Sequence, residues 1–327
     1  MRAAVYVRPG DAGTIELREI PAPEWGPRDL LVDVAYAGLN RADLLERAGR
    51  YGIPIPPGGY SVPGMEYAGT VAAAGNRVEG FAPGDRVFGI VAAGAHAAQV
   101  AVDAGTALRV PDGLSLEAAA ALPEAFITAW DALIRSGGFT LGKTVVVHAI
   151  GSGVGLAALA LAKHAGGTVL GTSRSEEKLV RARALGLDEG VLLDADWPAR
   201  ALAMTGGRGA DLALDFIGTA TFDRNVQALA TGARIVQIGT LGGARGEIAL
   251  GPFMAKRLAY VGTVLRSRPL DEKIALAREF QAHVVPLFGT GALQGAVDRT
   301  FALDEIADAH RHMEADRNFG KVLLAIG

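Results

Sequence analysis

The sequence contains no cysteine among its 327 residues. This absence excludes disulfides, cysteine nucleophiles, iron–sulfur clusters and zinc sites held by thiolates. Any chemistry that this protein performs must therefore use other side chains or a bound cofactor.

The sequence also has no large excess of charge of one sign and no long apolar runs. The 32 Lys and Arg residues and 35 Asp and Glu residues are mixed along the chain and give a net charge of -3, so no basic face is predicted that would neutralise the phosphates of a nucleic acid. No stretch of about 18 uncharged apolar residues occurs, and the N-terminal segment has no apolar leader. We expect a cytoplasmic protein with neither nucleic acid nor a membrane as its main partner.

The composition that remains is typical of a soluble globular protein, with half of the residues apolar and a fifth charged. No repeat at a period of about 20 to 50 residues indicates a solenoid. Because single hydrophobic cores stop growing near about 250 to 300 residues, the length favours two domains.

Two different rhythms follow one another along the chain. Up to about Val110 the segments are short, strand-like and separated by turn residues, which indicates an irregular β domain. After Ser115, strands alternate with amphipathic helical segments, beginning with a helical segment from Ser115 to Gly137, and this alternation predicts a parallel sheet. Six strand candidates that fit a doubly wound order start at Thr144, Thr168, Gly190, Asp211, Ala233 and Ala259. The pattern predicts an α/β protein with a Rossmann domain at 121–265, whereas residues 266–327 return to complete a first, mostly β domain at 1–120.

A glycine-rich turn follows the first of these strands and leads into a helix-like segment. The turn comprises Gly151, Ser152, Gly153, Val154 and Gly155. Glycines at such a turn let the backbone approach a pyrophosphate, whose charge the N–H groups and dipole of the helix N-terminus stabilise. The alternative is an ordinary tight turn in any α/β protein, because the spacing differs from the plain Gly-x-Gly-x-x-Gly pattern.

The end of the next strand indicates which dinucleotide binds. Sites specific for NAD carry Asp or Glu there for the ribose 2′-hydroxyl, but this chain has Ser173 and Arg174, with Lys178 nearby. Hydroxyl groups and cations suit a 2′-phosphate, which favours NADPH. The alternative is that Arg174 and Lys178 are solvated residues paired with Glu176 and Glu177.

Several segments together resemble one known family. They are GLNRADLLERAGRY from Gly38, GMEYAGTV, FAPGDRVFG, LPEAFITAW, VVVHAIGSGVG and GKVLL, and they cover essentially the whole chain in order. The chain resembles the zinc-independent, zeta-crystallin-like NADPH:quinone oxidoreductases of the medium-chain dehydrogenase/reductase superfamily. This resemblance implies a GroES-like catalytic domain, a Rossmann domain, a cofactor cleft between them, and a homodimer formed through the Rossmann sheet edge.

The resemblance also bears on zinc. Zinc-dependent relatives hold the catalytic metal with Cys, His and Cys, and the corresponding positions here are Asn40, Met65 and Glu124. Amide and thioether groups do not replace thiolate and imidazole ligands, so no metal site is expected. Hydride transfer without a metal favours a quinone or enone, in which the incoming charge spreads through a conjugated system.

By resemblance, Asn40 and Tyr51 are the catalytic residues. The Asn40 amide would orient the nicotinamide ring or the carbonyl, and the Tyr51 hydroxyl would donate to the substrate. Alternatively, Asn40 is a helix N-cap and Tyr51 a packing residue of a loop. The loop from Tyr51 to Ser61 is expected to shape the acceptor pocket.

Further cofactor contacts follow from the same mapping. Ser152 is expected at a phosphate or near the nicotinamide, and Thr128 at the cofactor; the weaker candidates are Gly239, Leu265, Asn318 and Lys321. Asp215 ends a strand and is interpreted as a capping or hydrogen-bonding residue rather than a catalytic one.

Three functions are compatible with the sequence. The first is reduction of a quinone or similar conjugated carbonyl by NADPH. The second is an NADPH-dependent alkenal or enoyl reductase on the same scaffold. The third is an NADPH-binding structural or sensor protein with little turnover.

Overall fold

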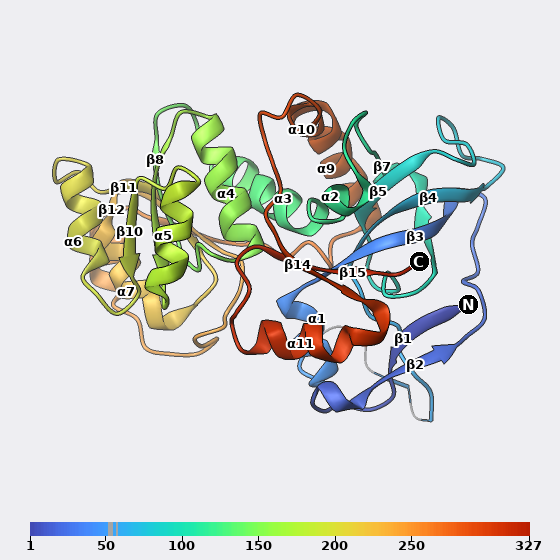
Figure 1. Cartoon of the computed structure of the whole chain (residues 1–327). Coiled ribbons are helices and arrows are strands. Elements are labelled where there is room, and N and C mark those ends of the chain that lie inside the picture. The colour runs from blue at the N-terminus through green and yellow to red at the C-terminus, as the bar shows by residue number, and fades with distance from the viewer. Residues whose placement is uncertain (52–54, 57) are drawn as a thin grey trace. The chain divides into compact units, whose positions relative to one another are not determined.

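The computed structural model describes residues 1–51, 55–56 and 58–327. Within the loop that is expected to shape the acceptor pocket, Gly52, Ile53, Pro54 and Pro57 lie outside the described residues. The chain forms two compact units, which are described separately (Figure 1): unit 1 comprises Met1–Ile127 and Arg266–Gly327, and unit 2 comprises Thr128–Leu265.

Unit 2 is built on a parallel sheet of six strands. Their order, β10-β9-β8-β11-β12-β13, is 3-2-1-4-5-6 when the strands are numbered along this unit, as in doubly wound dinucleotide-binding folds. The strands are β8 (Thr144–Val147), β9 (Thr168–Ser173), β10 (Glu189–Leu192), β11 (Ala210–Asp215), β12 (Leu229–Gln237) and β13 (Ala259–Gly262). The predicted Rossmann sheet is confirmed.

Helices connect these strands, and polar side chains fix where several of them begin. The helices are α4 (Gly153–His164), α5 (Glu176–Ala184), α6 (Trp197–Met204), α7 (Thr219–Ala228) and α8 (Leu250–Ala255). The side chains of Ser152, Ser175 and Asp196 accept a backbone N–H in the first turn of α4, α5 and α6, respectively. Such caps satisfy N–H groups that have no partner within the helix.

The segment Ser115–Gly137 is divided rather than continuous. Helix α2 (Leu116–Ala120) ends before α3 (Pro123–Trp130), and a π-helix follows at Asp131–Ser136. Pro123 explains the break, because proline cannot donate a backbone hydrogen bond and disfavours helical geometry in the residue before it. Helix α2 packs against β3 and β4 of unit 1.

Unit 1 is built on a sheet of mostly antiparallel strands. Its order is β14-β15-β3-β4-β5-β7, with β6 also pairing with β3, and β1 and β2 form a separate pair. The strands are β1 (Arg2–Tyr6), β2 (Ile15–Glu19), β3 (Asp29–Leu39), β4 (Glu66–Ala74), β5 (Arg86–Ile90), β6 (Gln99–Asp103), β7 (Leu108–Arg109), β14 (Val297–Ala302) and β15 (Lys321–Ala325). Figure 1 shows β15, in red, beside β3, in blue, and the two strands pair antiparallel. The C-terminal segment thus completes this mostly β unit.

Further α-helices of unit 1 lie in both of its sequence segments. They are α1 (Arg41–Arg47), α9 (Leu270–His283), α10 (Val285–Gly289) and α11 (Ile306–Glu314). Ile306 and Met313 of α11 are buried in one cluster with Leu39 and Val322 from the sheet. This packing holds the ends of β3 and β15 together, where the polar side chains described below lie.

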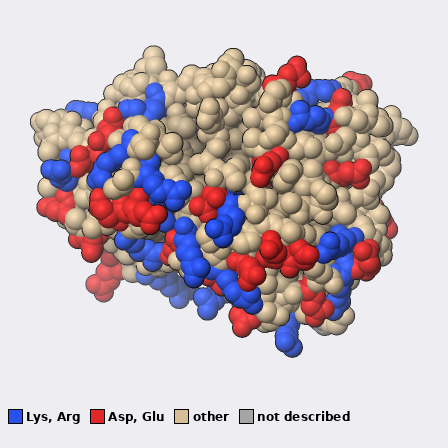
Figure 2. Space-filling model, viewed as in Figure 1, with Lys and Arg blue, Asp and Glu red and all other residues tan. Residues whose placement is uncertain are grey.

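The surface carries charges of both signs. On the face drawn in Figure 2, Lys and Arg side chains are interspersed with Asp and Glu side chains. Within residues 1–51, 55–56 and 58–327, none of the helices combines the length and the apolar character needed to span a bilayer.

Candidate active site

The glycine-rich turn joins β8 to the N-terminus of α4. The Ser152 hydroxyl oxygen accepts the N–H of Gly155 at 3.0 Å, and α4 runs for 12 residues from Gly153. A helix of this length presents a positive dipole and free N–H groups at its N-terminus, which suits a phosphate. A Cβ atom on Gly155 would lie 2.6 Å from the carbonyl oxygen of Ala149 and 2.7 Å from that of Ile150. Only glycine therefore lets α4 approach the turn this closely.

The predicted 2′-phosphate readers lie at the end of β9 and the start of α5. Ser173 is buried, and its hydroxyl oxygen accepts the N–H of Ser175 at 3.1 Å. The stem of Lys178 packs beside Gly151, since a Cβ added there would lie 2.9 Å from Cδ of Lys178. The structure thus brings the α5 cation next to the glycine-rich turn.

The neighbouring acids of α5 have basic partners in the same helix. Glu176 pairs with Arg183 at 3.1 Å, and Glu177 with Arg181 at 3.8 Å. Arg174 is exposed and precedes Ser175, the N-cap residue of α5. Recognition of a 2′-phosphate by Arg174 and Lys178 stays a prediction.

A buried hydrogen-bond network lies between β8 and β11, where the strand order reverses. Asn225 Nδ2 donates to Asp215 Oδ2 at 2.6 Å, so Asn225 Oδ1 is the atom that faces His148 Nε2 at 2.9 Å. The proton of His148 is therefore on Nε2, and Nδ1 accepts from the Thr172 hydroxyl at 2.7 Å. Burial lowers the pKa of His148, which keeps the imidazole neutral.

Asp215 organises the loop that follows β11. Its Oδ1 accepts the N–H groups of Ile217 at 2.6 Å and Gly218 at 2.9 Å, which is the structural role that the sequence predicts. The carbonyl oxygen of Asp215 also accepts the N–H of Gly239 at 3.4 Å. Gly239 therefore lies at the crevice edge of the sheet, where ligands of this fold class bind.

Two further residues that are predicted to contact the cofactor, Thr128 and Leu265, are the first and last residues of unit 2 in the sequence. Thr128 is a buried residue of α3, and Leu265 is buried at the last position of the unit. Their contact with a cofactor stays a prediction.

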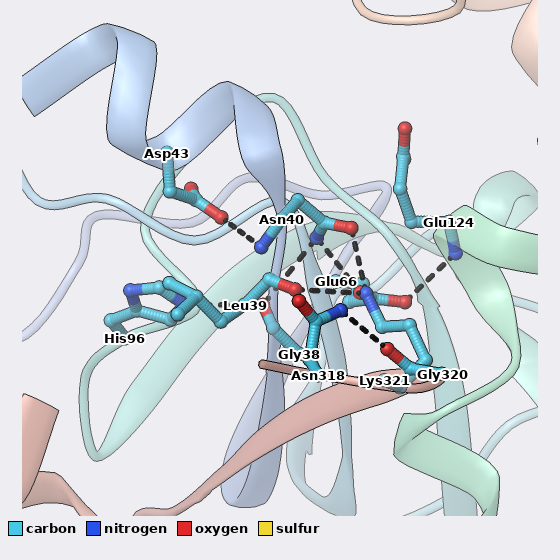
Figure 3. Close-up of polar contacts among 10 residues, drawn as sticks. All are labelled: Gly38, Leu39, Asn40, Asp43, Glu66, His96, Glu124, Asn318, Gly320 and Lys321. Carbon is cyan, nitrogen blue, oxygen red and sulfur yellow. Dashed lines mark hydrogen bonds and ion pairs between the residues drawn. The ribbon is translucent and has the colours of Figure 1, made fainter. Parts of the chain in front are cut away.

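The polar centre of unit 1 consists of Asn40, Glu66 and Lys321 (Figure 3). Lys321 Nζ donates to Asn40 Oδ1 at 2.6 Å and to Glu66 Oε1 at 2.5 Å, and Asn40 Nδ2 donates to Glu66 Oε1 at 2.8 Å. The second carboxylate oxygen, Oε2, accepts the backbone N–H of Glu124 at 2.8 Å. These contacts close a ring of hydrogen bonds around a carboxylate that is fully buried.

Asn40 occupies the N-cap position of α1, as its alternative interpretation proposes, but its amide is not used as a cap. The backbone N–H of Asn40 donates to Asp43 Oδ2 at 2.7 Å. The amide instead contacts Glu66 and Lys321. The backbone role and a role for the side chain in chemistry are therefore compatible.

Two predicted cofactor residues belong to the same region. Lys321 donates its third hydrogen to the carbonyl oxygen of Leu39 at 3.1 Å, and it is 4% exposed. All three of its hydrogens thus serve protein acceptors, and a direct phosphate contact would require one of these bonds to break. Asn318 Nδ2 donates to the carbonyl oxygen of Gly320 at 3.0 Å.

Tyr51 packs against Arg266. The Arg266 guanidinium carbon is 5.4 Å from the centre of the Tyr51 ring, within the range of a cation–π contact. Arg266 pairs with buried Glu46 at 2.7 Å. Burial raises the pKa of Tyr51, so the phenol stays protonated at neutral pH and offers an O–H donor.

Two further buried groups flank the ring. Burial raises the pKa of Asp43 to about 7 and lowers that of His96 to about 4. His96 Nε2 faces the carbonyl oxygen of Gly38 at 3.2 Å, which places its proton on Nε2. The ring therefore lies among buried ionisable groups whose pKa values are displaced, which is typical of functional sites.

Glu66 is not among the site residues predicted from the sequence, although its sequence context carries a signal. Glu66 stands among apolar residues in the segment GMEYAG at the start of β4, and an acid in an apolar strand is buried only when it is paired. The partner, Lys321, lies 255 positions away, so the pattern alone could not supply it.

The residues of unit 2 fit the pyrophosphate of a dinucleotide, because a helix N-terminus, a turn that tolerates no Cβ at Gly155 and a nearby cation meet at the crevice edge of the sheet. For metals, no set of three or more His, Cys, Asp or Glu side chains suited to bind an ion occurs within the described ranges.

Two family models match the chain. The model "Alcohol dehydrogenase GroES-like domain" matches residues 26–112, and "Zinc-binding dehydrogenase" matches residues 153–282. A crystal structure of an NAD-dependent alcohol dehydrogenase is 34% identical, with 100% of both chains covered and a TM-score of 0.89.

Curated relatives include a quinone oxidoreductase-like protein and polyketide synthases. Quinone oxidoreductase-like protein 2 of Mus musculus is 29% identical over 95% of this chain and 89% of the relative. The pikromycin polyketide synthase component PikAII of Streptomyces venezuelae is 34% identical over 97% of this chain, which spans 8% of that relative's length. From the fold, the cofactor turn and these likenesses we conclude that the chain belongs to the medium-chain dehydrogenase/reductase superfamily of oxidoreductases.

Proposed function

We propose that this protein transfers a hydride from NADPH to a quinone or a similar conjugated carbonyl, without a catalytic zinc ion. The observation that carries the proposal is the make-up of the polar centre of unit 1. It consists of an amide, an ammonium and a carboxylate, whereas catalytic zinc requires thiolate, imidazole or several carboxylate ligands. An acceptor that delocalises the incoming charge needs only hydrogen-bond donors of this kind.

In this proposal, residues of unit 2 hold NADPH. The N-terminus of α4, from Ser152 to Gly155, binds the pyrophosphate, and Ser173, Arg174 and Lys178 bind the 2′-phosphate. Thr128, Gly239 and Leu265 are further cofactor contacts, as are Asn318 and Lys321 of unit 1. The bound cofactor supplies the hydride, and the protein supplies orientation and charge stabilisation.

In the same proposal, hydrogen-bond donors of unit 1 contact the acceptor. Tyr51 stays protonated, and its hydroxyl group donates a hydrogen bond to the acceptor oxygen. Asn40 donates a second hydrogen bond from its amide N–H. Each such donor stabilises the negative charge that develops on this oxygen during hydride transfer.

A panel of acceptors tests the proposal. Steady-state oxidation of NADPH is measured with several quinones, enones, enals and enoyl thioesters. Quinones are expected to give the highest kcat/KM. If no member of the panel is reduced while NADPH still binds tightly, a structural or sensor role replaces the proposed activity.

A second candidate is the reduction of an alkenal or enoyl compound. The likeness of 97% of this chain to a segment of a polyketide synthase favours it. In that case, the enals or enoyl thioesters of the panel are reduced faster than any quinone.

The preference for NADPH predicts the effect of reversing one charge. Arg174→Glu is expected to weaken NADPH binding by about 10-fold or more, because a carboxylate would repel the 2′-phosphate, and to change NADH binding by less than about 3-fold. Arg181→Glu, in the helix α5 that follows Arg174, makes the same charge change and serves as the control. Calorimetric titration with each dinucleotide measures the effect, and wild-type protein that binds NADH as tightly as NADPH would contradict the preference.

We further propose that the protein forms a homodimer through the edge of the unit 2 sheet. Strand β13 is the last strand of this sheet, and Tyr260 in it is 48% exposed, with Leu250 and Met254 of α8 also exposed. An exposed apolar edge strand is a template for pairing with another chain.

A lysine on this edge should separate the two copies. Light scattering is expected to give twice 33.7 kDa for the wild type and 33.7 kDa for Tyr260→Lys, because a charge at the edge opposes pairing. Val180→Lys, on the exposed face of α5, is the control and should stay dimeric. A monomeric wild type would reject the proposal.

A further inference from the structure

The hydrogen-bond ring in unit 1 determines which way the Asn40 amide faces. Lys321 can only donate, so the Asn40 atom 2.6 Å from its ammonium must be Oδ1. The Glu66 carboxylate accepts, so the atom 2.8 Å from it must be Nδ2. An exchange of the two atoms would break both contacts, and the ring therefore fixes one orientation of the amide.

This orientation leaves one N–H of Asn40 weakly engaged. Nδ2 carries two hydrogens, and one of them is donated to Glu66. The other has the carbonyl oxygen of Gly38 at 3.5 Å, at the outer limit of a hydrogen bond. Asn40 is partly exposed, unlike Glu66 and Lys321. It can therefore give its second hydrogen to a ligand oxygen, whereas Oδ1 is held by the ammonium.

Both partners of Asn40 are themselves immobilised. Glu66 is fully buried and also accepts the backbone N–H of Glu124. The Lys321 ammonium is held by three acceptors, one of which is the carbonyl oxygen of Leu39. A buried ion pair adds little net stability, but it enforces a particular geometry because any other arrangement leaves a charge unpaired.

We propose that Glu66 and Lys321 are positioning residues that present the Asn40 amide as a hydrogen-bond donor to the carbonyl oxygen of the acceptor. This inference rests on the proposed function. In the reaction, the acceptor gains two electrons and one hydrogen as a hydride, NADPH becomes NADP⁺, and negative charge develops on the acceptor oxygen. A proton from solvent then neutralises this oxygen. Between hydride transfer and this protonation, the Asn40 N–H stabilises the negative charge on the oxygen.

The test uses quinones that differ in reduction potential. Electron-poor quinones stabilise the developing charge themselves and depend less on the donor. In Glu66→Gln and Lys321→Met, kcat/KM is expected to fall by about 10- to 100-fold for electron-rich quinones and by less for electron-poor ones. The slope of log kcat/KM against reduction potential therefore becomes steeper. NADPH affinity, measured by fluorescence titration without an acceptor, is expected to change less than about 3-fold for Glu66→Gln.

A double-mutant cycle separates positioning from general stability. If Glu66 acts through Asn40, then adding Glu66→Gln to Asn40→Ala lowers activity no further. Lys163→Met, which removes a Lys–carboxylate ion pair with Asp188 on unit 2, should leave the slope unchanged. If Lys321→Met does not fold, the isosteric Glu66→Gln alone carries the test.

Two outcomes would overturn the inference alone: an equal loss of activity for all quinones, or additive effects of the Asn40 and Glu66 substitutions. A wild type that reduces neither quinones nor enones with NADPH would instead remove the proposed function itself.

Discussion

Replacing Gly155 by alanine should abolish most of the cofactor affinity of unit 2. The new Cβ would meet two carbonyl oxygens at 2.6 and 2.7 Å, and both belong to the backbone, so neither can rotate away. Relief requires α4 to move away from the turn, which withdraws its N–H groups from the phosphate. Overpacking of this kind costs about 1–3 kcal/mol, and the same energy taken from binding is about a 10- to 100-fold loss of NADPH affinity.

The turn has little room to adapt to this change. Ala149, which supplies one of the two oxygens, already has a φ of 48°, a left-handed conformation that residues other than glycine rarely adopt. Gly251→Ala is the matched control, because nothing lies within 4 Å of a Cβ at that position. Fluorescence titration with NADPH measures the loss of affinity, and thermal unfolding measures the loss of stability. Wild-type affinity in Gly155→Ala would show that α4 does not position the phosphate.

Replacing Asp43 by asparagine should stabilise the protein at neutral and alkaline pH. Burial raises the pKa of Asp43 from 3.8 to about 7 in the folded state, so the folded protein holds this proton more tightly than the unfolded chain does. The contribution of this carboxyl group to the free energy of unfolding is fully present below about pH 4, and it is lost as the pH rises through 7. The carboxylate then costs up to about 4 kcal/mol.

The amide introduced by Asp43→Asn would keep the native contact without the charge. Its oxygen can still accept the N–H of Asn40, the bond that Asp43 Oδ2 makes. The difference in unfolding free energy between Asp43→Asn and the wild type is therefore expected to grow between about pH 4 and pH 8, as measured by urea titration at several pH values. Asp308→Asn removes an exposed carboxylate and is the control. A difference that is constant with pH would refute the assignment of a buried proton to Asp43.

Local patterns were sufficient to predict the fold class. Alternating strands and helices after Ser115 indicated a parallel sheet, and the strand order confirms it. The break at Pro123 was less visible, because the apolar residues around it continue the helical pattern even though proline interrupts the hydrogen bonds.

The candidate site was predictable only where its parts are close in sequence. The glycine-rich turn and the residues at the end of β9 are local features, and both meet at the same edge of the sheet. The ring around Glu66 depends on pairing between β3, β4 and β15, which no local pattern encodes. Likewise, the hydrogen-bonded chain from Thr172 to Asp215 joins strands β9 and β11, the residue after β8 and helix α7, and the shared burial of these side chains is a property of the folded unit.

The position of Lys321 in the chain also has a consequence for biosynthesis. The ribosome makes Asn40 and Glu66 before their cationic partner, which follows 281 and 255 positions later, after all of unit 2. During translation, the carboxylate of Glu66 therefore stays solvated until Lys321 has been made. Strand β3 likewise cannot pair with β15 before that point. Because domains fold as units while the chain emerges, unit 2 can fold first, and the ring of Asn40, Glu66 and Lys321 can close only after β15 has been made.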